Sequence, residues 1–200
     1  GLPFLLFKKT KHIATIFSQS FWVMRIISGS HKGKRILAPK KLPVRPTTDR
    51  SKEALFNILQ HQFEWENTSA LDLFSGTGSI SYEFGSRGVK EIIAVDQNKM
   101  CKDFIRKTSE RLELNIKAIQ MDVIKYLSTI STSYDLIFAD PPYHQKKHQY
   151  ISLIETIFDN NLVKQEGLLI IEHSSQKKLE SHPRFSKSRK YGSNVFSFFE

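Results

Sequence analysis

The segment Asp140–Tyr143, "DPPY", places a carboxylate, two prolines and an aromatic ring directly after the apolar run "YDLIFA". Proline cannot donate to a sheet ladder, so the pair ends a strand and holds the Asp140 carboxylate and the Pro141 carbonyl in fixed, projecting positions. Two such acceptors suit the two N–H groups of an amine, and Tyr143 could stack on a base drawn from its neighbours. The structural alternatives are a stiff turn at Pro141–Pro142 and a core position for Tyr143.

Three more acidic residues follow or close predicted strands. Asp72 lies in "ALDLF", Asp96 closes "EIIAVD" and Asp122 ends "IKAIQMD". Ligands of parallel sheets bind beyond the carboxyl ends of the strands, where a carboxylate in the place of Asp96 suits a ribose diol. Asp122 could accept from an adenine amino group, or it could cap the next helix. Clustered carboxylates destabilise a fold unless something pairs with them, so these positions predict a ligand-binding cleft.

A glycine turn, "DLFSGTGS", follows the first of these strands. Gly76 and Gly78 allow a ligand to approach the backbone closely. A dinucleotide fingerprint would have a third glycine at position 81, but this sequence has Ser81. A nicotinamide-dependent oxidoreductase is therefore the least favoured enzyme class.

Strands and helices alternate along the chain. The strands "ALDLF", "EIIAVD", "IKAIQMD", "YDLIFAD" and "GLLIIEHS" alternate with helices predicted near residues 79–86, 98–112, 123–130 and 148–160. Two closing strands, "FSKSRKYG" and "NVFSFFE", meet at a tight turn. The pattern predicts a Rossmann-like α/β fold, with a seven-stranded, mostly parallel sheet, one antiparallel strand and helices on both faces.

We expect three parts. Residues 1–23 precede Met24 and form a leader or appended segment that we expect to be dispensable. Residues 24–66 form a small extension of two strands, "RIISG" and "KGKRILAP", and a helix in "TTDRSKEALFNILQHQF". Residues 67–200 form the α/β domain.

The charge of the chain favours a polyanionic partner. Lys and Arg number 30 against 20 Asp and Glu, which gives a net charge of +10 and a pI near 9.6. Nucleic acid is the first candidate partner, and a generally basic surface is the alternative. Nine basic residues fall between Met24 and Lys52, and Arg45 and Arg50 among them could instead brace the cofactor side. The predicted RNA contacts are Arg25, Lys32, Lys34, Arg35, Arg45, Arg50, Lys146 and Lys147.

Other classes of site are disfavoured. Cys101 is the only cysteine, so the chain cannot form an internal disulfide or a multi-thiolate metal site, and a reducing cytoplasm is expected. His144 and His148 lack an evident third ligand, so we predict no metal. The sequence has no apolar run of about 18 residues or more, so no membrane contact is expected.

The motifs "DLFSGTG", "AVD", "QMD" and "DPPY" together resemble those of class I S-adenosylmethionine-dependent methyltransferases. The opening "MRIISGSHKGKRIL" and the following "RPTTDRSKEALFNIL" resemble the RsmD family of 16S ribosomal RNA guanine-N2 methyltransferases. The resemblance covers Met24 to Glu200. It implies methylation of a guanine amine, at position 966, in ribosomal RNA or in the assembled small subunit. We take a monomer as the default expectation.

The resemblance also assigns roles to residues. Asp140, Pro141, Pro142 and Tyr143 would hold the target base, Asp96 the ribose hydroxyls, and Asp122 the adenine amine with Val123 beside the ring. The remaining residues predicted to bind S-adenosylmethionine are Asp72, Phe74, Ser75, Gly76 and Gly78.

Two other functions remain open. A DNA adenine-N6 or cytosine-N4 methyltransferase would use a similar motif, but no target-recognition domain is evident in the sequence. A non-catalytic RNA-binding module on the same fold is the alternative of another class.

Overall fold

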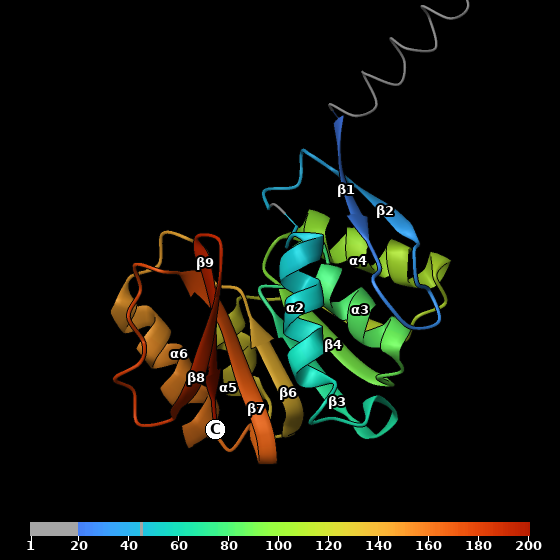
Figure 1. Cartoon of the computed structure of the whole chain (residues 1–200). Coiled ribbons are helices and arrows are strands. Elements are labelled where there is room, and N and C mark those ends of the chain that lie inside the picture. Colours follow the sequence, from blue (N-terminus) through green and yellow to red (C-terminus); the bar gives the residue numbers. More distant parts are fainter. Residues whose placement is uncertain (1–19, 45) are drawn as a thin grey trace, which may run out of the picture.

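Seven strands form the main sheet of the computed structural model, which describes residues 20–44 and 46–200 (Figure 1). Their order across the sheet is β5-β4-β3-β6-β7-β9-β8. The strands are β3 (Ser69–Leu73), β4 (Glu91–Asp96), β5 (Ile116–Gln120), β6 (Tyr134–Ala139), β7 (Val163–Ser174), β8 (Phe185–Tyr191) and β9 (Asn194–Phe199). The first five are parallel, and β9 runs antiparallel to both of its neighbours. The predicted sheet is confirmed.

The strand order reverses between β3 and β6. From β3 the chain proceeds outward through β4 and β5, then returns to place β6 on the other side of β3. Such a switch point leaves a crevice at the carboxyl ends of the two central strands. The glycine turn follows β3 and the Asp140 segment follows β6, so both predicted motifs meet at this crevice.

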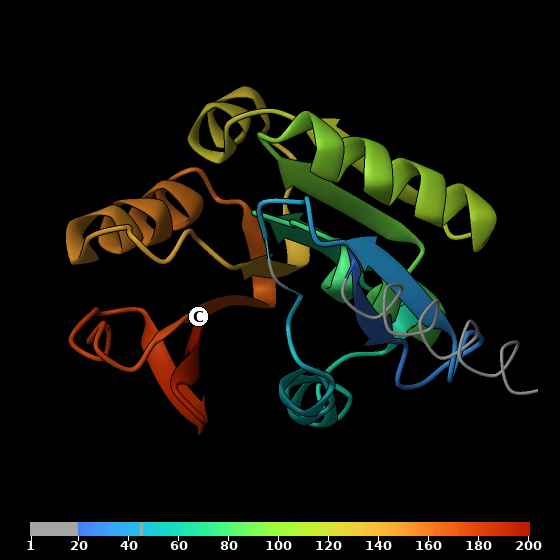
Figure 2. The same cartoon turned by 90° about the horizontal axis from the view of Figure 1, so that it is seen from above.

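Helices cover both faces of the sheet (Figure 2). They are α2 (Asp49–Leu59), α3 (Ser79–Arg87), α4 (Lys99–Arg111), α5 (Val123–Thr129) and α6 (Lys147–Asp159). Buried side chains of α2, α3 and α4 form one apolar cluster with one face of the sheet, and α5 and α6 form a second cluster with the other face. The expected helices are all present, with ends within about two residues of the predicted ones.

Side-chain caps fix where three of these helices begin. Thr48 accepts from the amide of Ser51, Asn98 from Cys101 and Asp122 from Lys125. Each cap satisfies a backbone N–H that has no partner within its helix. The helix-capping alternative for Asp122 is therefore confirmed.

The N-terminal extension contains a separate antiparallel hairpin of β1 (Phe21–Arg25) and β2 (Arg35–Pro39), beside α3 and α4 in Figure 1. The prediction of a strand at "RIISG" is wrong, because the strand ends where that segment begins. The amides of Ile27 and Ser28 donate to the Glu83 carboxylate, and Gly29 turns the chain with a φ of 88°. The Glu83 side chain thus accepts the hydrogen bonds that a neighbouring strand would otherwise accept from Ile27 and Ser28.

The structure places the start of the N-terminal extension earlier than the predicted boundary after residue 23, because β1 begins at Phe21. Phe21, Trp22 and Val23 pair with residues of β2, so they belong to the hairpin rather than to a leader. The rest of the predicted leader lies outside the described residues. Over the described ranges, no helix combines the length and apolarity needed to cross a bilayer.

A buried ion-pair network joins the extension to the α/β domain. Lys52, 1% exposed, lies 3.7 Å from Glu83 and donates to the carbonyl of Arg25 at 2.7 Å. Arg87 pairs with the same carboxylate at 2.9 Å. Removing one partner of such a network leaves an uncompensated charge and costs about 3–5 kcal/mol. Lys52, one of the nine basic residues noted in the sequence, is therefore unavailable to RNA.

Candidate active site

The glycine turn after β3 has an unusual backbone. Phe74, Gly76 and Gly78 all have positive φ angles of 56°, 55° and 83°. A Cβ atom on Gly78 would lie 2.7 Å from the Tyr82 ring, so only glycine fits there. For Phe74 the left-handed conformation is strained, and such strain is typical of functional sites.

The hydroxyl of Ser75 is suited to contact a ligand. Within the described part of the chain, its Oγ is a buried side-chain atom that has no hydrogen-bond partner. Buried polar atoms are almost always paired, so a polar group of a ligand would be a suitable partner for this oxygen. A ligand with a polar group at the glycine turn would supply it.

Asp96 ties the glycine turn to the end of β4. Its Oδ2 accepts from the amide of Gly76 and its Oδ1 from the amide of Asn98, both at 2.9 Å. A carboxylate has about four acceptor positions, so two remain for the hydroxyls of a ligand. The predicted place of Asp96 at the carboxyl end of a strand is confirmed.

Asp72 is a buried carboxylate on β3, 1% exposed. Ser81 Oγ donates to its Oδ2 at 2.7 Å. Burial, aided by the charge of Asp96 and opposed by hydrogen bonds from Ser81, raises the pKa of Asp72 to about 7. Ser81, noted in the sequence only because it is not glycine, is thus the hydrogen-bond partner of this carboxylate.

A third buried carboxylate, Glu172, was missed by the sequence analysis. It lies near the carboxyl end of β7 and is 5% exposed. The only signal was an acidic residue inside the apolar run "GLLIIEHS", at the same edge as the other acids. Burial raises the pKa of Glu172 to about 7, against hydrogen bonds from Asn194 and Thr47.

The register of the sheet puts two carboxylates on one face, with a third just beyond the strand between them. Asp72 is paired with Phe138, and Phe138 is paired with Ile170. Glu172 comes two residues after Ile170 in β7, so it shares a face with Asp72. Asp140 directly follows the last residue of β6. The face that Asp72 and Glu172 share is the one covered by α2, α3 and α4.

The Asp140–Tyr143 segment leaves the sheet at the end of β6. The Asp140 amide donates to the carbonyl of Leu73 at 3.3 Å, which anchors the segment beside the glycine turn. Burial, then the charges of Glu172 and Asp72, raise the pKa of Asp140 well above its ordinary value. Tyr143 is 79% exposed, so the alternative of a core tyrosine is wrong and its ring is free to stack on a ligand.

Asp122 and Val123 lie at the end of β5. Asp122 is exposed and caps α5 through one carboxylate oxygen, and Val123 is buried in the apolar cluster of α5 and α6. Because the cap uses only Oδ1, a ligand could still contact the other oxygen of Asp122.

The predicted RNA contacts form two groups. Arg25, Lys32, Lys34 and Arg35 are exposed on or beside the β1–β2 hairpin, and Arg25 also pairs with Asp49 at 3.6 Å. Arg50 is exposed on α2, and Lys146 and Lys147 are exposed where α6 begins, a few residues after Tyr143. Arg45 lies outside the described residues.

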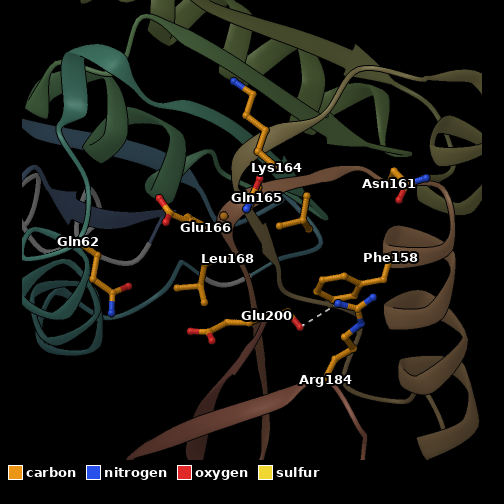
Figure 3. Close-up of a pocket in the computed structure, with 11 residues that line it drawn as sticks. Gln62, Phe158, Asn161, Lys164, Gln165, Glu166, Leu168, Arg184 and Glu200 are labelled. Carbon is orange, nitrogen blue, oxygen red and sulfur yellow. Dashed lines mark hydrogen bonds between the residues drawn. The ribbon is translucent and has the colours of Figure 1, made fainter.

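A pocket also lies at the opposite end of the strands from the candidate site. A pocket of about 650 Å³ lies at the amino end of β7, where Arg184 donates to the Glu200 carbonyl and covers the Phe158 ring (Figure 3). It contains none of the predicted site residues. In the described part of the chain, no group of three or more His, Cys, Asp or Glu side chains is arranged to hold a metal ion.

Solved structures share this fold. The putative methyltransferase yhhF from Escherichia coli superposes with a TM-score of 0.75 and 23% identity, over 89% of this chain and 97% of that chain. The Thermus thermophilus 16S rRNA N2 G1207 methyltransferase RsmC, solved with AdoMet and guanosine, superposes with a TM-score of 0.66 and 20% identity, over 90% and 50% of the two chains. This chain therefore has the Rossmann-like fold of these methyltransferases.

The family follows from the sequence comparisons. The family model described as "Conserved hypothetical protein 95" matches residues 24–200. The chain belongs to this family, the RsmD family of S-adenosylmethionine-dependent methyltransferases.

Curated relatives fit this assignment. The chain is 32% identical over 161 residues to the putative rRNA methyltransferase YlbH of Bacillus subtilis, which is 78% of this chain and 85% of that protein. It is 31% identical over 153 residues to the ribosomal RNA small subunit methyltransferase D of Buchnera aphidicola, which is 76% of each.

Proposed function

We propose that this protein transfers a methyl group from S-adenosylmethionine to the exocyclic N2 amine of a guanine in small-subunit ribosomal RNA, at position 966. The observation that carries the proposal is the Asp140–Tyr143 segment, which is anchored beside the glycine turn with the Tyr143 ring exposed. The names of the relatives support ribosomal RNA as the substrate class. We expect the protein to act in the cytoplasm, as a monomer, on free RNA or on the assembled subunit.

S-adenosylmethionine fits the glycine-turn edge, and when bound it supplies an electrophilic methyl group on a sulfonium centre. The free acceptor positions of Asp96 would hold the ribose hydroxyls and one of Asp122 the adenine amine, with Val123 contributing an apolar contact to the ring. Ser75 Oγ, which has no partner in the described chain, and the backbone of Gly76 and Gly78 border the methionine end. The carboxylate of Asp72 suits the ammonium group at that end.

Asp140 and Pro141 act on the target amine. The lone pair of an exocyclic amine is delocalised into the ring, so attack on a methyl carbon requires the nitrogen to become tetrahedral. The Asp140 carboxylate and the Pro141 carbonyl accept its two N–H groups and favour that geometry, and the prolines keep both acceptors in place. Alignment of this kind is worth roughly 7–11 kcal/mol of the barrier.

Tyr143 and the basic residues position the RNA. A guanine turned out of its helix can stack on the exposed Tyr143 ring, as enzymes that act on bases require. Lys146 caps α6 and Lys147 begins it, a few residues after Tyr143, and the hairpin carries the second basic group. Contacts of these groups with phosphates would fix the register of the RNA without reading its sequence.

One experiment tests the substrate and the position together. Small-subunit RNA and whole subunits from cells that lack the protein are incubated with the purified chain and tritiated S-adenosylmethionine, and the modified nucleoside is mapped by mass spectrometry. The proposal predicts N2-methylguanosine at one position. Transfer to DNA adenine or cytosine would support the alternative enzyme, and no transfer to any nucleic acid would support the non-catalytic RNA-binding module.

A further inference from the structure

Glu172 is a buried carboxylate to which the proposed reaction gives no role. Ala139, the last residue of β6, is paired with Ile171 of β7, and the next residues along the chain are Asp140 and Glu172. The charge of Glu172 acts on Asp140, so the two carboxyl groups lie close to each other. Glu172 is therefore the neighbour of the residue that is proposed to hold the target amine.

Two neutral donors from distant segments hold Glu172 in place. Asn194 Nδ2 donates to its Oε1 at 3.1 Å, and Thr47 Oγ1 donates to its Oε2 at 3.5 Å. Within residues 20–44 and 46–200, no cation forms an ion pair with Glu172. When Glu172 is ionised, no cation of the described residues compensates its charge, and this charge raises the pKa of Asp140.

We propose that Glu172 is a positioning residue for methyl transfer: it holds the Asp140 carboxylate toward the substrate amine and makes Asp140 the acceptor of the proton that this amine loses. The inference rests on the proposed function. The lone pair of guanine N2 forms the new bond to the methyl carbon while the carbon–sulfur pair returns to sulfur. The nitrogen becomes positively charged, and one of its N–H protons passes to an oxygen of Asp140.

The charges around the pair favour this direction of proton transfer. Burial and the charges of Glu172 and Asp72 raise the pKa of Asp140, which makes it a better base than an exposed aspartate. Among the described residues, Tyr150 of α6 is a further titratable group near Asp140; burial, then the Asp140 charge, raise its pKa to about 12. Because the two carboxylates interact strongly, they ionise in two steps that belong to the pair.

Glu172→Gln in the full chain tests the proposal, with methylation of small-subunit RNA measured as a function of pH. Glutamine keeps the shape and removes the charge, so Asp140 ionises more easily. The acid limb of the kcat profile should move to lower pH by about one pH unit or more. The maximal kcat should fall, with unchanged affinity for S-adenosylhomocysteine. A purely structural role would lower kcat by the same factor at every pH and leave the limb in place.

The matched control is Glu166→Gln, which removes an exposed carboxylate from the opposite end of the same strand. This control should leave the acid limb of the kcat profile at the same pH. If the wild type methylates guanine and Glu172→Gln leaves the acid limb at the same pH, the inference is wrong. If the wild type methylates no guanine, the proposed function is wrong. An NMR titration then still tests whether Glu172 and Asp140 are coupled.

A carbon-13 NMR titration of the carboxyl groups needs no substrate. Asp140 should titrate at lower pH in Glu172→Gln than in the wild type. If that variant does not fold, Asp140→Asn replaces it, because coupling between two sites is reciprocal. Glu172 should then titrate at lower pH than in the wild type. Unchanged titration of the remaining carboxyl group would refute the coupling.

Discussion

Ser81 Oγ donates a 2.7 Å hydrogen bond to Asp72 Oδ2, and both side chains are buried. Hydrogen bonds from Ser81 offset only part of the cost of burying the carboxylate, so burial raises the pKa of Asp72 to about 7. The fold therefore keeps a carboxylate where a neutral group would be more stable. We infer that this cost is retained for binding the cofactor.

Asp72→Asn should stabilise the protein at pH 8 and change little at pH 4. The folded protein holds a proton on Asp72 up to about pH 7, whereas the unfolded chain loses it near 3.8. Folded molecules bind more protons in this window, so the stability of the wild type falls as the pH rises through it. The expected gain at pH 8 is on the order of 2–4 kcal/mol, from urea unfolding.

Asp135→Asn is the control for this measurement. Burial disfavours the charge of Asp135, but hydrogen bonds from Ser69 and the ammonium of Lys164 outweigh it and lower its pKa. Its loss should destabilise the protein at pH 8, the opposite sign. A destabilised Asp72→Asn at that pH would contradict the account of Asp72.

Asp96→Ala should weaken the binding of S-adenosylhomocysteine much more than the binding of RNA. The change removes the proposed ribose acceptor and releases the amides of Gly76 and Asn98 from their hydrogen bonds. Each hydrogen bond to a charged group is worth about 1.5–3 kcal/mol, so affinity should fall at least tenfold. Calorimetry measures this, and equal affinity in the variant would remove Asp96 from the site.

Asp140→Ala should reduce turnover far more than affinity for either substrate. The Asp140 acceptor matters most as the nitrogen becomes tetrahedral, so its loss should cost roughly 2.7–4 kcal/mol of the barrier, by analogy with oxyanion-hole donors. Asp140→Asn keeps a carbonyl acceptor, so single-turnover rates should rank wild type, Asn, then Ala. Near-normal turnover in the alanine variant would reduce the segment to the stiff turn that the sequence also allowed.

Lys34→Glu with Arg35→Glu should weaken RNA binding and flatten its dependence on salt. Each phosphate contact contributes roughly 0.7–0.9 to the magnitude of the slope of log affinity against log salt. The matched control reverses Lys107 and Lys117, two exposed lysines on α4 and β5. If both double variants have the same slope, the hairpin does not contact phosphates.

A chain that starts at Met24 should be less stable than one that starts at Ser20. The shorter chain lacks Phe21, Trp22 and Val23, which pair with Pro39, Ala38 and Leu37. Two-stranded hairpins are marginal, so losing three of five pairs should remove most of the ordered hairpin. Thermal unfolding of the two chains compares them, and identical melting temperatures would restore residue 24 as the boundary.

Local patterns predicted most of the fold because they repeat along the chain. Apolar runs bounded by capping residues such as Asn98 and Asp122 predicted the parallel strands and their helices to within a few residues. Acids at strand ends predicted the site edge. The start of β1 was missed because its hairpin partner and the Glu83 carboxylate, both distant in sequence, decide where the strand lies.

The role of Glu172 could not be predicted for a related reason. Glu172 is a single acid within an apolar strand and has no local partner. Its hydrogen-bond donors, Thr47 and Asn194, lie 125 and 22 positions away in the sequence. Tyr143 was ambiguous because exposure depends on what covers a loop, which no short motif encodes. Lys52 was counted with the surface cations because its partner, Glu83, lies 31 positions away in the sequence.

The two donors of Glu172 have a consequence for protein synthesis. Thr47 leaves the ribosome long before Asn194, and Glu172 lies between them in the sequence. Synthesis runs from the N-terminus, so N-terminal parts can fold first. The Glu172 carboxylate can therefore be held on both of its oxygens only after the first residue of β9 has been made.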